Sequence, residues 1–122
     1  MKTGMIYLLL MITFCSLQSQ SCEELMQTVK NSGYGQTFNS NITSNAISKV
    51  TFYDVSVNYQ TLYFAIVCFK KEYGFGCNEY LYQVAFNTRS QYSFSYMNSA
   101  GKAFWNYIHP HRDNLGCAPD IN

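Results

Sequence analysis

The amino-acid sequence predicts a single α+β domain: a three-stranded antiparallel β-meander with an N-terminal helix and C-terminal helices packed on it. Three observations lead to this fold class. Residues 21–35 carry apolar side chains at helical spacing, residues 49–86 contain three strand-like segments, and residues 88–111 return to helical spacing. The length of 122 residues agrees with one domain.

The first 21 residues have the layout of a secretory signal peptide. Lys2 precedes an apolar run over residues 5–14, and small or polar residues follow up to Ser21. The apolar run is shorter than the roughly 20 residues that a helix needs to cross a bilayer, so we expect no stable membrane span. We assign residues 1–21 to the signal peptide and residues 22–122 to the domain. An uncleaved anchor, or cleavage a few residues earlier, is the alternative.

The N-terminal helix is predicted from one apolar stripe, which consists of Cys22, Leu25, Met26 and Val29. Ser21 and Glu24 have the spacing of a capping box, and Gly33 marks the end of the helix. The next segment, residues 36–46, is polar and rich in turn-forming residues, which predicts a loop.

Three strands are expected in the middle of the chain. Residues 49–57 alternate between two faces, and residues 61–69 are apolar throughout, as in a central strand that is buried on both faces. Residues 79–86 alternate again and place three aromatic side chains on one face: Tyr80, Tyr82 and Phe86. Short connections make an antiparallel meander the simplest topology.

A C-terminal helix is predicted from a second apolar stripe, formed by Ala100, Ala103, Phe104, Tyr107 and Ile108. Lys102, Trp105 and His109 lie off this stripe. Pro110 disfavours helical geometry at the residue before it, so we expect the helix to end at His109.

Cysteine usage agrees with export. One of the five cysteines falls within the signal peptide, which leaves Cys22, Cys68, Cys77 and Cys117. Four cysteines in a small exported domain predict two disulfides, for which three connectivities exist. Because Cys68 and Cys77 lie at the two ends of one expected loop, we expect a Cys68–Cys77 bridge and a Cys22–Cys117 bridge. The expected location is secreted or periplasmic, at a bacterial envelope.

Three short motifs occur in a fixed order: Ile47 with Val50, Tyr80 with Tyr82, and Ser99 with Gly101 ahead of an aromatic-rich helix. In this order they resemble the KTSC domain family, a module named for the C-terminus of some lysyl-tRNA synthetases that also occurs alone in small bacterial proteins. The resemblance covers roughly residues 44–109. It implies a compact sheet followed by helices, and RNA binding has been suggested for the family from the synthetase context.

The chain also departs from the family pattern and from the charge of a nucleic-acid binder. Trp105 stands where the family commonly has Asn, and the cysteines lie outside the pattern. Without Lys2, seven basic residues balance seven acidic residues. A neutral domain lacks the basic footprint of a nucleic-acid binder. Nucleic acid is therefore disfavoured, and a protein or glycan partner is expected.

Six residues are candidate ligand contacts: Tyr80, Tyr82, Lys102, Trp105, His109 and His111. The two tyrosines form either a wall of the core or a stacking platform. Lys102 follows a glycine near a helix start, where an anion could bind. The two histidines flank a proline, and they could cleave RNA as an acid–base pair or complement the dipole of the preceding helix.

The sequence predicts no metal and no cofactor. A zinc site built from the cysteines with His109 or His111 lacks the usual Cys-x-x-Cys pair. No Ser/His/Asp arrangement and no Gly-rich phosphate loop occurs in the sequence. We therefore predict a non-enzymatic exported binding or interaction module. An RNA-binding domain is the alternative, and a small ribonuclease that uses the two histidines is a further one.

Overall fold

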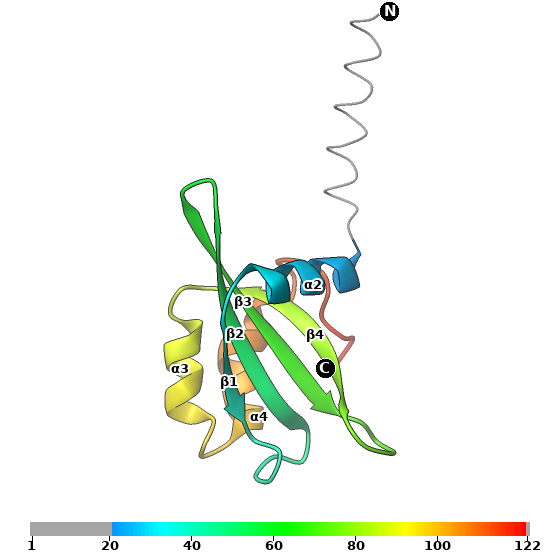
Figure 1. The fold of residues 1–122 in the computed structure, drawn as a ribbon. Coiled ribbons are helices and arrows are strands. Elements are labelled where there is room, and N and C mark those ends of the chain that lie inside the picture. Colours follow the sequence, from blue (N-terminus) through cyan, green and yellow to red (C-terminus); the bar gives the residue numbers. More distant parts are fainter. Residues whose placement is uncertain (1–20, 122) are drawn as a thin grey trace, which may run out of the picture.

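The computed structural model describes residues 21–121 and has an α+β fold (Figure 1). Its elements in chain order are α2 (Cys22–Ser32), β1 (Gly35–Asn39), β2 (Ile47–Val57), β3 (Gln60–Lys70), β4 (Cys77–Val84), α3 (Thr88–Ser95), α4 (Ala100–Ala103), the π-helical turn η1 (Phe104–Ile108) and the 3₁₀ turn η2 (His109–His111). The expected signal peptide lies outside the described residues, except for Ser21. Within residues 21–121, no helix is both long enough and apolar enough to cross a membrane.

The sheet has four antiparallel strands in the order β1-β2-β3-β4, so the prediction of three strands was wrong. The missed strand is β1, which falls mainly in the segment that the sequence assigns to a loop. Four of its five residues are exposed, and only Phe38 turns toward the core. An edge strand with one buried side chain carries no alternation that a sequence pattern can reveal.

Gly35 lets β1 approach β2 closely. A Cβ atom at this position would lie 2.6 Å from Cγ2 of Thr51 and 2.7 Å from the ring of Tyr53. At the other end of the strand, the ring of Phe38 contacts the rings of Phe52 and Tyr96, with centroids 5.8 and 5.2 Å apart. A close backbone approach and one aromatic anchor therefore hold the edge strand in place.

Both faces of the sheet are covered. On one face, α3, α4 and η1 enclose a core that includes Val50, Ala65, Val67 and Phe104. On the other face, α2 and the C-terminal tail cover a smaller cluster that contains Val29, Val55, Phe64, Ile66, Leu81 and Cys117. Figure 1 shows α2 crossing one face of the sheet while α3 and α4 lie on the other. The prediction that the central strand is buried on both faces is confirmed.

The alternating aromatics of β4 have different environments. Tyr82 is 1% exposed and its ring contacts that of Phe104 at 5.7 Å, which makes it a core residue. Tyr80 is partly buried and packs on the same core. Phe86 is 74% exposed because β4 ends at Val84 and the chain turns away from the sheet.

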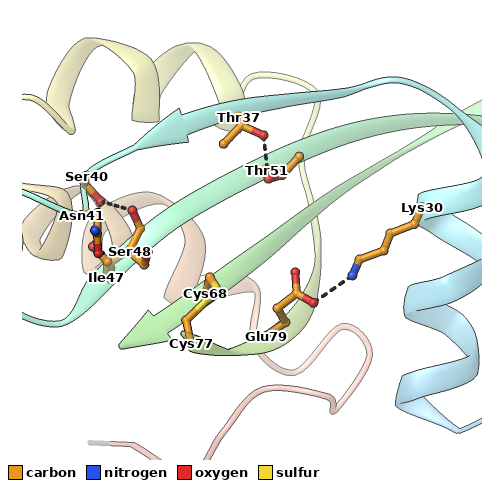
Figure 2. Close-up of a disulfide and its surroundings, with 10 residues drawn as sticks. All are labelled: Lys30, Thr37, Ser40, Asn41, Ile47, Ser48, Thr51, Cys68, Cys77 and Glu79. Carbon is orange, nitrogen blue, oxygen red and sulfur yellow. Dashed lines mark hydrogen bonds and ion pairs between the residues drawn. A yellow bond between two sulfur atoms is a disulfide. The ribbon is translucent and has the colours of Figure 1, made fainter. Parts of the chain in front are cut away.

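The N-terminal helix has the predicted boundaries. The amide of Glu24 donates to Oγ of Ser21 at 3.1 Å, and the helix ends before Gly33. Only Val29 of α2 is fully buried, so the apolar contact of this helix with the sheet is small. Lys30 adds an ion pair to Glu79 of β4, with Nζ and Oε1 2.8 Å apart (Figure 2).

Both predicted disulfides are present, Cys22–Cys117 and Cys68–Cys77, with Cα atoms 5.6 and 5.3 Å apart. The first joins the start of α2 to the C-terminal tail. The second closes the loop between β3 and β4 (Figure 2). Two disulfides in a domain of this size are typical of an oxidising, extracytoplasmic compartment.

The C-terminal helical segment uses the predicted stripe, but it is not one regular helix. Ala100, Ala103, Phe104 and Ile108 are all buried. The segment widens into a π-helical turn at Phe104 and then narrows into a 3₁₀ turn at His109–His111. Pro110 stands at the start of that 3₁₀ turn, where a missing amide donor costs little. The sequence therefore placed the buried face correctly and missed the change of helical pitch.

Replacing Tyr82 by phenylalanine should leave the stability within about 1 kcal/mol of the wild type or raise it. The buried hydroxyl has no hydrogen-bond partner among the described residues, so its removal relieves an unpaired polar group. Tyr82→Ala should cost about 3–5 kcal/mol because it removes the ring that contacts Phe104. Urea unfolding measures both changes. Equal losses for the two variants would contradict this account of the core.

Removing the long-range disulfide should destabilise the domain more than removing the short one. In the chain-entropy model, closing a loop across a separation of 95 residues contributes about 4.7 kcal/mol, and closing one across 9 residues about 2.5 kcal/mol. Urea unfolding of Cys22→Ala/Cys117→Ala and of Cys68→Ala/Cys77→Ala tests this order. A larger loss in the second double variant would show that local geometry outweighs chain entropy.

Candidate functional site

Four of the six candidate contacts belong to one aromatic cluster with Phe104 at its centre. The ring of Phe104 lies 5.7 Å from Tyr82, 5.8 Å from Trp105 and 5.8 Å from His109. The fourth candidate contact, Tyr80, is connected through Phe69, whose ring lies 5.3 Å from Phe104 and 5.8 Å from Tyr80. The cluster therefore runs from the buried sheet face to the surface of the C-terminal helical segment.

The surface end of this cluster consists of the exposed Trp105 and the partly buried His109, which we call the aromatic surface. Their ring centroids are 4.1 Å apart, and Trp105 as a residue keeps 42% of its surface exposed. The amide of His109 donates to the carbonyl of Phe104, five residues earlier, which closes the wide π-helical turn. Because Phe104 is buried, this turn ties both rings to the core.

The imidazole of His109 is held mainly in its neutral form. Its Nδ1 atom is buried and has no hydrogen-bond partner in the part of the chain that the structure describes. Burial of the ring lowers the pKa of His109, and the nearby Arg112 cation lowers it further, whereas Asp113 raises it. A neutral imidazole against an indole forms an uncharged aromatic contact surface at pH 7.

Lys102 and His111 lie apart from this ring contact. Lys102 is exposed, and its amide donates to Oγ of Ser99 at 3.1 Å, so the serine of the Ser-x-Gly motif caps the short helix α4. His111 is partly buried in the 3₁₀ turn, and no hydrogen bond or ring contact with His109 occurs in the described range. Among residues 21–121, no group of three or more His, Cys, Asp or Glu residues could hold a metal ion.

Several cations are already engaged within the fold. Lys30 pairs with Glu79, and Arg89 pairs with Asp54 at 3.4 Å. The Nζ atom of Lys70 donates to backbone carbonyls of the loop that follows β1. These contacts reduce the positive charge that is free to meet a phosphate backbone.

A groove beside β4 is a second candidate site, and the sequence pattern did not predict it. Its walls are the first turn of α2 (Cys22, Glu23 and Met26) and the strand residues Cys77–Leu81, and Cys117 borders it. We call it the edge groove. Its volume is about 400 Å³, which is within the usual range for ligand sites. Only the tertiary structure brings these segments together, because they come from three distant parts of the chain.

No protein-family model, curated protein or solved structure matches this chain. The resemblance to KTSC domains therefore stays a prediction.

Acidification should quench the fluorescence of Trp105, which is the only tryptophan in the chain. A protonated imidazole quenches an indole in contact with it, and the lowered pKa of His109 places the midpoint below about 6.5. The measurement is an emission titration of the folded protein between pH 4 and pH 8. The transition should vanish in His109→Gln and persist in His111→Gln. A transition that depends on His111 would contradict the assigned contact.

Proposed function

We propose that the chain is a small, non-enzymatic interaction module that is exported to the bacterial envelope and binds a protein partner through the aromatic surface. The observation that carries the proposal is the contact between Trp105 and His109, with ring centroids 4.1 Å apart and Trp105 42% exposed. The apolar run at residues 5–14 and the two disulfides support export.

The physical argument concerns the entropy of binding. Tryptophan is enriched among the residues that contribute most to protein interfaces, because it buries a large area with few rotatable bonds. Here the indole also rests on the rings of Phe104 and His109, which restrict its motion before any partner binds. A side chain that is already ordered loses less entropy on association.

RNA binding is the second candidate, and the resemblance to KTSC domains favours it. A stacking platform made of both tyrosines is not available, because Tyr82 is 1% exposed. The formal net charge is +1, and Lys30 and Arg89 are paired with acids of the fold. An RNA site would therefore have to use Trp105 and Lys102. A ribonuclease would need His109 and His111 to act on one phosphate, although the two rings have no contact with each other.

Proximity labelling in the exported fraction of the native organism tests the proposed function. Trp105→Ala should lose the labelled partners that the wild type retains, because truncation of a buried interface indole commonly costs more than 1 kcal/mol. Phe94→Ala is the matched control, since Phe94 is an exposed aromatic on α3 with 85% of its surface accessible. Identical partner sets for all three proteins would overturn the proposal.

Two titrations followed by Trp105 emission separate the other partner classes. Quenching by a single-stranded RNA that weakens steeply with salt would favour the RNA-binding candidate. Saturable quenching by envelope oligosaccharides would favour a glycan partner. Cleavage of the RNA by the wild type, together with loss of this cleavage in both His109→Ala and His111→Ala, would favour the ribonuclease.

A further inference from the structure

We propose that the edge groove binds an extended, positively charged peptide segment, which pairs as an added strand with the outward backbone groups of Glu79 and Leu81 at the edge of β4. This site goes beyond the proposed function, because it lies beside α2 and uses neither Trp105 nor His109. The inference rests on the direction of the backbone groups of β4, on the walls of the groove and on its charge.

The backbone of β4 presents hydrogen-bonding groups away from the sheet. Within residues 21–121, no strand lies on the outer side of β4. The carbonyl of Gln83 points outward, because it accepts from Nδ2 of Asn114 at 2.7 Å. Both backbone groups of a residue in an antiparallel strand point to the same side, and the side alternates along the chain. Leu81 and Glu79 therefore also direct their N–H and C=O groups outward.

The hairpin between β2 and β3 leads to the same assignment independently. Its turn residues Asn58 and Tyr59 both have positive φ, which makes a two-residue turn whose flanking residues form a hydrogen-bonded pair. From that pair, the direction of the backbone groups alternates along β3 and, through the register between β3 and β4, along β4. This alternation directs the backbone groups of Tyr80 and Tyr82 to β3. Within residues 21–121, no backbone hydrogen bond reaches the outward groups of Glu79 or Leu81.

The C-terminal tail bonds to this edge through Nδ2 of Asn114, but within residues 21–121 its backbone does not pair with β4. Leu115 and Cys117 pack on the face covered by α2, whereas Ala118 and Ile121 pack on the opposite face. Pro119 has no amide donor, and the amide of Ile121 turns back to the carbonyl of Pro119 at 3.0 Å. The tail therefore crosses the edge instead of forming a strand along it.

Both disulfides border the groove and fix the positions of its walls. Cys22–Cys117 fixes the first turn of α2, and Cys68–Cys77 fixes the beginning of β4. The Lys30–Glu79 ion pair links α2 directly to β4 (Figure 2). A groove with walls fixed in this way loses little entropy when a peptide enters it.

The charge of the groove selects a cationic occupant. Glu23 lies on one wall, is exposed and forms no ion pair with any described residue. Glu79 lies on the other wall and shares its charge with Lys30. A lysine or arginine in the added strand would reach both carboxylates. A second copy of this chain is a poorer occupant, because edge-to-edge pairing of two β4 strands would bring like charges and two α2 helices together.

The inference is tested with a labelled hexapeptide that alternates lysine and valine, added to the oxidised protein at low salt. Fluorescence anisotropy should show saturable binding with a dissociation constant below about 1 mM. A glutamate–valine hexapeptide lacks the charge and should bind at least tenfold more weakly. The lysine–valine peptide with N-methylated lysine amides should also bind at least tenfold more weakly, because a lysine opposite Glu79 directs its backbone donors to β4. No binding of the lysine–valine peptide at 1 mM, on the same scale, would overturn the proposal.

Amide hydrogen exchange supplies a direct readout of strand addition. In the free protein, the amides of Glu79 and Leu81 should exchange faster than those of Tyr80 and Tyr82, which are bonded to β3. The bound peptide should slow exchange at Glu79 and Leu81 at least tenfold. Binding that leaves both amides unchanged would overturn the proposal.

Protein variants separate charge from backbone pairing and from the aromatic surface. Glu23→Gln should weaken peptide binding about threefold to fivefold, as for a partly exposed ion pair, whereas the same change in the exposed loop residue Glu72 should have no effect. Glu79→Pro removes an outward amide without losing a ladder bond, and it should weaken binding beyond Glu79→Gln.

Trp105→Phe should leave the affinity for the peptide unchanged. This variant therefore distinguishes failure of the edge-groove proposal from failure of the proposed function at the aromatic surface. If Trp105→Phe removes binding while Glu79→Pro does not, the peptide occupies the aromatic surface and the proposal is wrong. A dimer in solution that Glu79→Pro dissociates would assign the edge to a second copy and would also overturn it.

Discussion

The structure depends on burying both faces of the central strand β3. Ala65 and Val67 point to the core under the C-terminal helices, and Phe64 and Ile66 point to the opposite cluster. A sheet with two apolar faces requires a cover on each side. The chain after β4 supplies one cover. The short helix α2 supplies the other. Only one of its residues is fully buried, so it depends on the disulfide that ties it to the C-terminal tail and on the ion pair that ties it to the sheet.

Each candidate site lies where one of the two covers of the sheet ends. On the helical side, a π-helical turn brings Trp105 and His109 into contact above the buried Phe104. On the α2 side, the helix stands off the edge of β4 far enough to leave a groove of about 400 Å³. One site presents rigid aromatic rings, and the other presents backbone groups with acidic walls. The two sites therefore suit different kinds of contact.

Sequence patterns predicted much of the fold because local chemistry decides it. The capped helix that begins after Ser21, the continuously apolar β3 and the two disulfides were all predicted correctly. The edge strand β1 was missed because its pairing with β2 depends on Gly35 and Phe38 in a polar segment. Phe86 has the right period to face the core, but its position beyond the end of β4 leaves it exposed.

By itself, the sequence determined the α+β class and the apolar faces of the main elements, because periodicity is a property of neighbouring residues. It favoured the observed pairing of the cysteines without excluding the two other connectivities. It also singled out Trp105 and His109, although not their contact. Only the tertiary structure decided that Tyr82 belongs to the core, that the two rings meet, and that α2 forms a groove with the edge of β4. These features join segments that are distant in the chain, and their geometry is set by packing across the sheet.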